Sequence, residues 1–363
     1  MALSKIQTSE MLDTPNLGRR NLIINGAMRF AQRATTASVD ANGYKTVDRF
    51  LMNIHTDFNS KSTMTKNLDS LTPPDYFNDY VGLEIDTATT ASGDVYFNFR
   101  QQIEAKNISH LKFGTSSAKT VTVSFWVRST LTGNFSLTLR NGPSDRSFVT
   151  TYNISAANTW EKKTITIAGD TTGTWTIDNG VGLTVNFGHG SSQGTYSTST
   201  LNQWQVGSKT GATGSVQMVE TVNSKWYITG LQIEVGDTAT DFEHLSYGEE
   251  LPLCQRYYQK IGAVARVSFG AAVAHTTGAV FCPVRFMTTM RTTPSQSHSG
   301  SENFYITGSN QNQSVPSGQT FGTEGINING VTLSVPGTVT VGNGYWFNCK
   351  ADAVGYIAWD AEL

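Results

Sequence analysis

The sequence predicts an all-β protein in four parts: an N-terminal extended anchor, a jelly-roll β-sandwich, a short helical connector and a C-terminal β-sandwich domain. Three observations lead to this fold class. Apolar and polar residues alternate with a period of two through most of the 363 residues, Gly- and Asn-rich breaks interrupt the alternating segments, and no long helical periodicity lies between them. Such alternation places one face of a strand on a core and the other in solvent, which is typical of antiparallel sheets packed as a sandwich.

The composition excludes several classes of protein. Charged residues make up 15% of the chain, against about 25% in typical globular proteins, but 10% of the residues are aromatic, which is too many for a disordered chain. The formal net charge of −2 argues against a broad basic surface for nucleic acid. No apolar run approaches the ~20 residues that cross a bilayer, so we expect no membrane insertion.

The sequence offers no pattern for catalysis or for a metal. Cys254, Cys282 and Cys349 are far apart and have no close Cys or His partner, so we expect three buried hydrophobic side chains rather than disulfides or zinc ligands. The motifs GxSxG, HExxH, GxGxxG and the P-loop do not occur in a usable context. We therefore expect no catalytic residue, no cofactor and no metal.

Residues 1–20 are polar and cannot form a core alone. They are either a disordered tail or an anchoring peptide that orders against a partner. The opening residues also lack the apolar centre of a secretion signal, so we expect the protein to fold where it is made and to need no oxidising compartment.

Residues 21–245 carry the alternation that predicts the jelly-roll module. In "DVYFNFRQQIE" the inward face comprises Val95, Phe97, Phe99 and Ile103, and the outward face comprises Tyr96, Asn98, Arg100 and Gln102. In "SKWYITGLQIEVGD" the inward parity changes from even to odd positions at Gly230, which predicts a β-bulge there. Asp48 and Arg49 in "TVDRF" could form an ion pair that closes a sheet edge, and we expect a structural role for them.

Residues 246–260 predict the helical connector, because Ser246 and Glu249 have the spacing of a capping box. Pro252 would clash with a preceding helical turn, so either the helix starts near Leu251 or its first turn is separate. Residues 261–363 return to the strand pattern, which continues to the last residues and ties the C-terminus into a sheet. Within this C-terminal domain, the turn-rich residues 291–330 are expected to be exposed loops.

Residues 230–258 hold as many acidic residues as any stretch of similar length in the chain. Each acid has a structural explanation: strand alternation turns Gln232 and Glu234 outward, turns use aspartates, and the helix start uses glutamates. The acids are Glu234, Asp237, Asp241, Glu243, Glu249 and Glu250. We expect a structural junction here rather than an active site; a structural calcium ion at Asp237 or Asp241 stays open, although the EF-hand spacing is absent.

Aromatic and amide side chains on loops are the remaining candidates for ligand contact. Sugar rings stack on Trp or Tyr, and polar side chains bond their hydroxyls. The candidates for glycan contact are His189, Tyr196, Trp204, Asn303, Tyr305 and Asn312. For each of them, a surface loop residue without a ligand is the favoured interpretation. Four further tryptophans lie within predicted strands and are expected to pack: Trp126, Trp160, Trp175 and Trp226.

Several motifs together resemble a family of bacteriophage tail-fibre and virion structural proteins that is common in phages of marine bacteria and cyanobacteria. These motifs are "NLIINGAMRFAQR", "TVDRF", "SFWVRS", "NTWEKKTITIAGDTTGTW" and "GLQIEVGDTATDFEHLSYGEELPLCQRYY", in order over residues 20–260. The resemblance implies a jelly roll like that of carbohydrate-binding modules, followed by a variable domain that faces the host. It implies no catalytic residues.

The resemblance also implies synthesis in the cytoplasm of the host bacterium, a place in the virion and a set of partners. Residues 1–20 would dock into a phage tail or capsid protein, the chain would form a homotrimer, and residues 261–363 would be the tip that meets a host glycan or protein receptor. Two other functions stay open. One is a capsid decoration or stabilising protein, and the other is a polysaccharide depolymerase, which needs two acids about 5–9 Å apart in a cleft.

Overall fold

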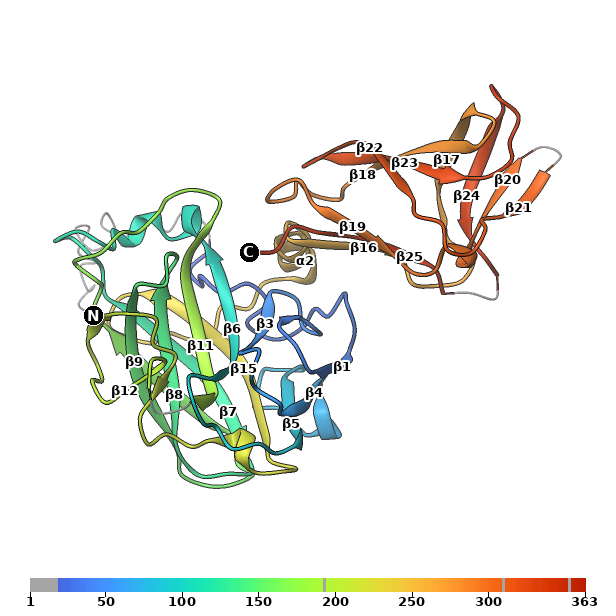
Figure 1. Cartoon of the computed structure of the whole chain (residues 1–363). Helices are drawn as coiled ribbons and strands as arrows, with labels where there is room; N and C mark the ends of the chain where they lie inside the picture. The colour runs from blue at the N-terminus through green and yellow to red at the C-terminus, as the bar shows by residue number, and fades with distance from the viewer. Residues whose placement is uncertain (1–18, 192–193, 309–310, 352–353) are drawn as a thin grey trace, which may run out of the picture.

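The computed structural model describes residues 19–191, 194–308, 311–351 and 354–363, so all but the last two residues of the predicted anchor lie outside the described part. The described chain is nearly all β, with one α-helix between two bodies of strands, which confirms the predicted fold class (Figure 1). No helix in the described residues is long and apolar enough to cross a membrane.

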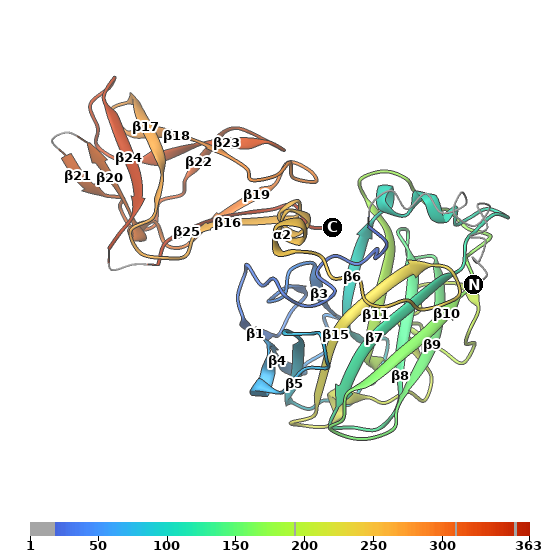
Figure 2. The same ribbon diagram turned by 180° about the vertical axis from the view of Figure 1, so that it is seen from behind.

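The larger body is a sandwich of two antiparallel sheets. The six-stranded sheet has the order β1 (Thr36–Val39), β4 (Lys61–Lys66), β5 (Val81–Thr87), β15 (Lys225–Val235), β7 (Val121–Ser129) and β10 (Glu161–Ile167). The seven-stranded sheet has the order β13 (Trp204–Val206), β9 (Arg146–Ile154), β8 (Gly133–Asn141), β11 (Val181–Ser191), β6 (Tyr96–Glu104), β3 (Phe50–Ile54) and β2 (Gly43–Tyr44). Figure 2 shows the long strands β15 and β7 of the six-stranded sheet side by side.

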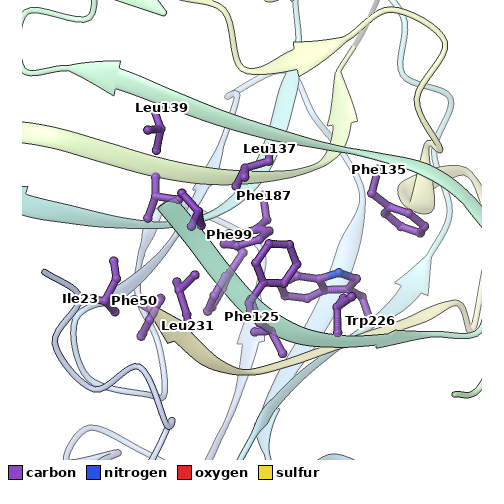
Figure 3. Close-up of a cluster of buried hydrophobic side chains, with 14 of the residues drawn as sticks. Ile23, Phe50, Phe99, Phe125, Phe135, Leu137, Leu139, Phe187, Trp226 and Leu231 are labelled. Carbon is purple, nitrogen blue, oxygen red and sulfur yellow. The ribbon is translucent and has the colours of Figure 1, made fainter. Parts of the chain in front are cut away.

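Aromatic side chains from both sheets fill the space between them. Trp226 on β15 is fully buried, and the centroid of its ring lies 5.5 Å from those of Phe99 and Phe187 (Figure 3). The indole nitrogen Nε1 donates a hydrogen bond of 3.1 Å to the hydroxyl of Tyr152. The prediction that Trp226 packs is confirmed.

The predicted bulge at Gly230 is confirmed. The register of β15 against β7 shifts between Thr229 and Gln232, and Gly230 has a φ of 63°, in the region that favours glycine. A Cβ on Gly230 would come within 2.6 Å of the ring of Phe77. Both backbone conformation and space therefore require glycine at this position.

Replacing Gly230 with alanine is expected to lower the free energy of unfolding by about 2–4 kcal/mol, since it adds left-handed strain to overpacking against Phe77. Gly93 provides the matched control, because its φ is 73° but no atom lies within 4 Å of a Cβ built there. Gly93→Ala should cost only about 1–2 kcal/mol. Equal losses in urea denaturation would show that the contact with Phe77 has no role.

The helix α2 (Tyr247–Gln255) begins with the predicted capping box of Ser246 and Glu249. Both expectations for Pro252 are wrong, because the helix starts at Tyr247 and continues through the proline. Pro252 has no amide hydrogen, so the helix lacks the hydrogen bond to the carbonyl of Gly248. The helical bonding continues beyond it, because the Pro252 carbonyl accepts a hydrogen bond from the Arg256 amide at 3.0 Å. The capping box therefore fixes the first turn despite the proline.

The acidic run packs against residues 20–25. Glu243 accepts hydrogen bonds from the amides of Arg20 and Asn21, and Glu250 accepts one from the amide of Asn25. Glu234 forms an ion pair of 3.3 Å with Arg20. These contacts make the run a structural junction, as predicted.

The expected exposure of two residues in that run is wrong. Gln232 and Glu234 turn away from the sandwich core, but their exposed fractions are 0% and 1%. Arg20 and Thr240 cover them, since the Thr240 amide and hydroxyl both donate to Glu234. Alternation indicates which face of the sheet a residue occupies, but it does not indicate whether that face is exposed to solvent.

The C-terminal body contains a three-stranded and a seven-stranded sheet. The first has the order β16 (Tyr258–Gly262), β25 (Tyr356–Asp360) and β19 (Ser295–His298). The second has the order β21 (Gln311–Ser314), β20 (Phe304–Gly308), β24 (Gly344–Cys349), β17 (Ser268–Thr276), β18 (Ala279–Arg285), β23 (Gly330–Pro336) and β22 (Gly322–Asn327). Strand β25 ties the C-terminus into a sheet as predicted, but residues 291–330 are not only loops, because β19–β22 lie within them. All three cysteines are free and buried, as expected.

The expected ion pair between Asp48 and Arg49 is wrong. Asp48 instead accepts hydrogen bonds from the amide and the side chain of Gln32. The fully buried Arg49 pairs with the buried Glu362 next to the C-terminus, and its guanidinium lies 3.4 Å from the ring centre of Tyr257. This pair joins the sandwich to the C-terminal body.

Candidate functional site

Three strands bring polar side chains together on the outer face of the seven-stranded sheet. Strand β6 turns its apolar residues to the core, so Asn98 and Arg100 turn outward. Arg100 lies opposite Asn186 on β11, and Asn186 lies opposite Thr138 on β8. Arg140 lies two residues further along β8. We call these five residues, Asn98, Arg100, Thr138, Arg140 and Asn186, the polar face.

The polar face contains buried hydrogen-bonding groups that have no partner. Asn98 and Asn186 are fully buried, and neither the oxygen nor the nitrogen of either carboxamide makes a hydrogen bond. The Thr138 hydroxyl is also buried and unpaired. Such groups are rare in proteins and each costs about 1–3 kcal/mol of desolvation. These amides are directed away from the apolar core, so their unpaired groups face the outer side of the sheet rather than the space between the two sheets.

Aromatic rings border this face at the start of β6. The ring of Tyr96 meets that of Tyr196 edge to face at 4.8 Å, and His55 lies 5.3 Å from Tyr96 on another side. All three side chains are partly exposed. Tyrosine rings next to unpaired amides combine a stacking surface with hydrogen-bonding groups.

A chain segment after β13 lies along one margin of the polar face. The amide of Ala212 donates to the Ser136 hydroxyl, and the Arg140 guanidinium donates to the Ser208 hydroxyl at 2.6 Å. Gly188 on β11 accommodates this segment, because a Cβ there would lie 3.1 Å from the carbonyl oxygen of Thr210. The segment closes the face at this margin, whereas Arg100 is partly exposed.

Both arginines of the polar face lie in unusual surroundings. Burial lowers the pKa of Arg140 to about 10, and repulsion from Arg100 contributes. Burial also lowers the pKa of Arg100. The two guanidinium groups are therefore close enough to interact, and both remain positively charged at neutral pH.

A pocket of about 740 Å³ lies on the opposite side of the sandwich. Trp126 on β7 and Lys162 on β10, which are paired across the strands, form its floor on the outer face of the six-stranded sheet. Trp160, the exposed Tyr76 and Asp241 also line it. Trp126 and Trp160 were expected only to pack, but both are partly exposed in this pocket.

The structure separates the sequence-based candidates. His189 lies in β11 rather than in the expected loop, and its ring is turned into the core, where it is fully buried 4.5 Å from the ring of Trp226. Trp204 is partly buried, and its Nε1 donates to the carbonyl of Ala168 at 2.8 Å. It packs against Phe113, Phe148 and Trp175. Tyr196 alone among the candidates lies beside the polar face.

The candidates of the C-terminal body lie apart from the polar face. Asn303, directly before β20, and Tyr305, within it, are partly exposed, and Asn312 is in β21, where it pairs with Thr307. The sequence reasoning missed Asn98, Arg100, Arg140 and Asn186. The alternation in β6 already placed Asn98 and Arg100 on its outward face. Only the register of the strands shows that Asn186 and Arg140 lie beside them.

His189 makes stability depend on pH. Burial lowers the pKa of His189 to about 3, and neither ring nitrogen has a partner. In the unfolded chain the pKa of a histidine is about 6.5. The stability contributed by the neutral, buried ring is therefore fully present above pH 6.5 and is lost as the pH falls toward 3.

Acidification from pH 7 to pH 4.5 should therefore lower the free energy of unfolding by about 2–3 kcal/mol through His189. His189→Phe removes the titration and should lose correspondingly less stability on acidification. His275→Phe, at an exposed position, is the control. Parallel pH profiles of the wild-type protein and His189→Phe in denaturant unfolding would contradict this assignment.

No group of three or more His, Cys, Asp or Glu residues that could hold a metal ion occurs within the described ranges. Asp237 and Asp241, the calcium candidates, are exposed. The hydroxyl of Thr238 donates to the Asp237 carboxylate, and the Asp241 carbonyl accepts from Arg20.

Comparisons with known proteins give partial structural likeness only. No family model matches the chain, and no curated protein matches it. The enzymatically active domain of tailspike protein 4 from bacteriophage CBA120 is 13% identical, with a TM-score of 0.30, over 60% of this chain and only 21% of that chain. A CBM4 structure is 12% identical, with a TM-score of 0.29, over 58% of this chain and 98% of that chain. The family 11 carbohydrate-binding module of a Clostridium thermocellum cellulase is 10% identical, with a TM-score of 0.27, over 57% of this chain and 98% of that chain. Scores this low support no conclusion about function.

Proposed function

We propose that this protein is a non-enzymatic, glycan-binding fibre component of a bacteriophage particle and that it attaches the particle to the host surface. The observation that carries the glycan part is the pair of buried, unpaired carboxamides of Asn98 and Asn186 on the outer face of the seven-stranded sheet. The motifs that resemble phage tail-fibre proteins support the particle part.

The chemistry of the polar face fits a saccharide. A sugar ring offers an apolar face for stacking on Tyr96 or Tyr196 and a rim of hydroxyls that both donate and accept hydrogen bonds. A carboxamide likewise donates and accepts, so a pair of hydroxyls satisfies both of its atoms. Satisfying amides that are already desolvated gains the hydrogen bonds without a new desolvation cost on the protein side.

Three alanine variants locate the site. Tyr96→Ala should weaken binding to the glycan about 5- to 150-fold, because loss of a stacking ring costs about 1–3 kcal/mol. Trp160→Ala changes the 740 Å³ pocket, and Tyr305→Ala changes the C-terminal body; both should bind like the wild-type protein. Affinity is measured by calorimetry with polysaccharides from a bacterial surface panel. A loss confined to Trp160→Ala or to Tyr305→Ala would place the site elsewhere.

The anchoring role of the N-terminus is tested by a deletion of residues 1–18. This boundary keeps Arg20, which binds Glu234 and the carbonyl of Asp241. The deleted protein should fold with unchanged melting temperature but should no longer join particles assembled from the remaining phage proteins. Normal incorporation would contradict the anchor.

Exposed apolar residues on the C-terminal body support the proposed homotrimer. Trp346 and Val273 are 56% and 55% exposed, and they lie on adjacent strands, since Trp346 pairs with Ala271. Trp346→Ser should lower the trimeric fraction in sedimentation if this surface lies between subunits. An unchanged trimer would place the contact elsewhere, and a monomeric wild-type protein would contradict the trimer.

A depolymerase is the second candidate, because Asp75 and Asp241 both line the 740 Å³ pocket. Both carboxylates are exposed, whereas the acid of a glycosidase is held in apolar surroundings. We therefore expect no release of reducing ends from any bound polysaccharide. Release that Asp75→Asn or Asp241→Asn abolishes would establish the enzyme. A capsid decoration role is distinguished by location in an image of the particle.

A further inference from the structure

Arg140, which is buried, and Arg100, which is partly exposed, lack the carboxylate partner that two other arginines of the sandwich have. Arg49 pairs with Glu362, and Arg146 forms two hydrogen bonds with Asp170. Arg100 and Arg140 form no ion pair with any described residue.

The hydrogen bonds of these two guanidinium groups are also incomplete. Arg140 is only 6% exposed, and its Nε has no hydrogen-bond partner. Its Nη1 donates a hydrogen bond to the Ser208 hydroxyl. The Nε of Arg100 is buried and unpaired as well. A guanidinium has five donors in a planar fork that fits an oxyanion, and burying it without one is costly.

The strand register places the two groups on one site. Thr184 on β11 lies opposite Arg140 on one side and Gln102 on the other, and the next outward position, Asn186, lies opposite Arg100. The arginines therefore flank β11 diagonally, with the unpaired amide of Asn186 between them. Arg100 is partly exposed and would meet a ligand first.

We propose that the polar face binds an acidic glycan, with Arg100 and Arg140 holding an oxyanion of the sugar and Asn98 and Asn186 bonding its hydroxyls. This assignment rests on the proposed glycan-binding function and specifies its ligand class. The oxyanion is a carboxylate, as in a uronic acid, or a sulfate or phosphate ester, since each fits the guanidinium fork. The net charge of −2 makes a general attraction of polyanions an insufficient explanation.

Two matched pairs of polymers test the ligand class. Polygalacturonate and fully methyl-esterified pectin share a backbone and differ in the carboxylate, and dextran sulfate and dextran differ in the sulfate. We expect the wild-type protein to bind at least one charged polymer at least tenfold more tightly than its neutral counterpart. Binding should weaken as salt is raised from 50 to 300 mM, because the contact is between charges.

Arginine variants test the residues. Arg100→Gln should lose at least tenfold in affinity for the charged polymer and should keep the melting temperature, since the guanidinium has no partner to lose. Arg140→Gln should lose as much, and Arg140→Lys should regain only part of it, because lysine lacks the fork. Arg285→Gln, at an exposed position on β18, is the control for unspecific charge and should bind like the wild-type protein.

The outcomes separate this inference from the proposed function. If the neutral and charged polymers bind equally, and Tyr96→Ala still weakens both, glycan binding stands and the acidic ligand is wrong. If Arg285→Gln weakens binding as much as Arg100→Gln, the attraction is unspecific and the assignment fails. If no polymer and no bacterial surface polysaccharide binds, the proposed function fails with it.

Discussion

Trp226→Ala is expected to lower the free energy of unfolding of the sandwich by about 4–5 kcal/mol, enough to leave much of it unfolded at 37 °C. Trp226 is fully buried between the two sheets and packs against Phe99 and Phe187. Removing the indole leaves a large cavity and also leaves the buried Tyr152 hydroxyl without its donor.

Trp226→Phe is the matched variant, because it keeps an aromatic ring and removes the indole N–H. It should cost about 1–3 kcal/mol, clearly less than alanine. Guanidinium unfolding followed by near-ultraviolet circular dichroism measures both. A loss below 2 kcal/mol for Trp226→Ala would mean that the sheets close over the cavity and that the core is not organised around this residue.

The second large effect is expected at the junction between the two bodies. Arg49→Met leaves the buried carboxylate of Glu362 with only its 3.4 Å ion pair to Arg33, and breaking a buried pair costs about 3–5 kcal/mol. The guanidinium also donates to the carbonyl of Gln102 and lies on the ring of Tyr257, so both contacts are lost with it. The midpoint of denaturant unfolding should therefore move to a lower denaturant concentration.

A double-mutant cycle provides the control for this junction. The variant with both Arg49→Met and Glu362→Gln removes the two charges together and should be more stable than Arg49→Met alone, because the buried carboxylate that loses Arg49 is then neutral. Glu362→Gln alone should cost less than Arg49→Met, since Arg49 keeps its bond to Gln102. Additive losses would show that the two side chains do not interact.

Local patterns in the sequence predicted the features whose causes are local. The parity change in "WYITGLQIEV" requires an extra residue in the strand, and glycine is the residue that adopts the left-handed conformation there. Ser246 and Glu249 cap the helix through contacts within one turn. His189 was misplaced, although Leu183, Val185 and Phe187 already indicated its inward parity.

Features that depend on distant strands were not predictable in this way. The partner of Arg49 lies at the C-terminus, whereas its neighbour Asp48 was the nearest acid in the sequence. The polar face likewise needs the register of β6 with β11 and of β11 with β8 before Arg100, Asn186 and Arg140 become neighbours. Each strand alone has an ordinary polar outer side. Their unpaired amides and guanidinium groups become unusual only when the three strands are placed together.

The central claim is that the outer face of the seven-stranded sheet binds a host glycan. A crystal structure of the protein with an oligosaccharide of the tightest-binding polysaccharide tests it most directly. We predict a sugar ring against Tyr96, with polar atoms about 3 Å from the Arg100 guanidinium and from the carboxamides of Asn98 and Asn186. A sugar bound instead between Trp126 and Trp160, or beside Asn303 and Tyr305, would contradict the claim.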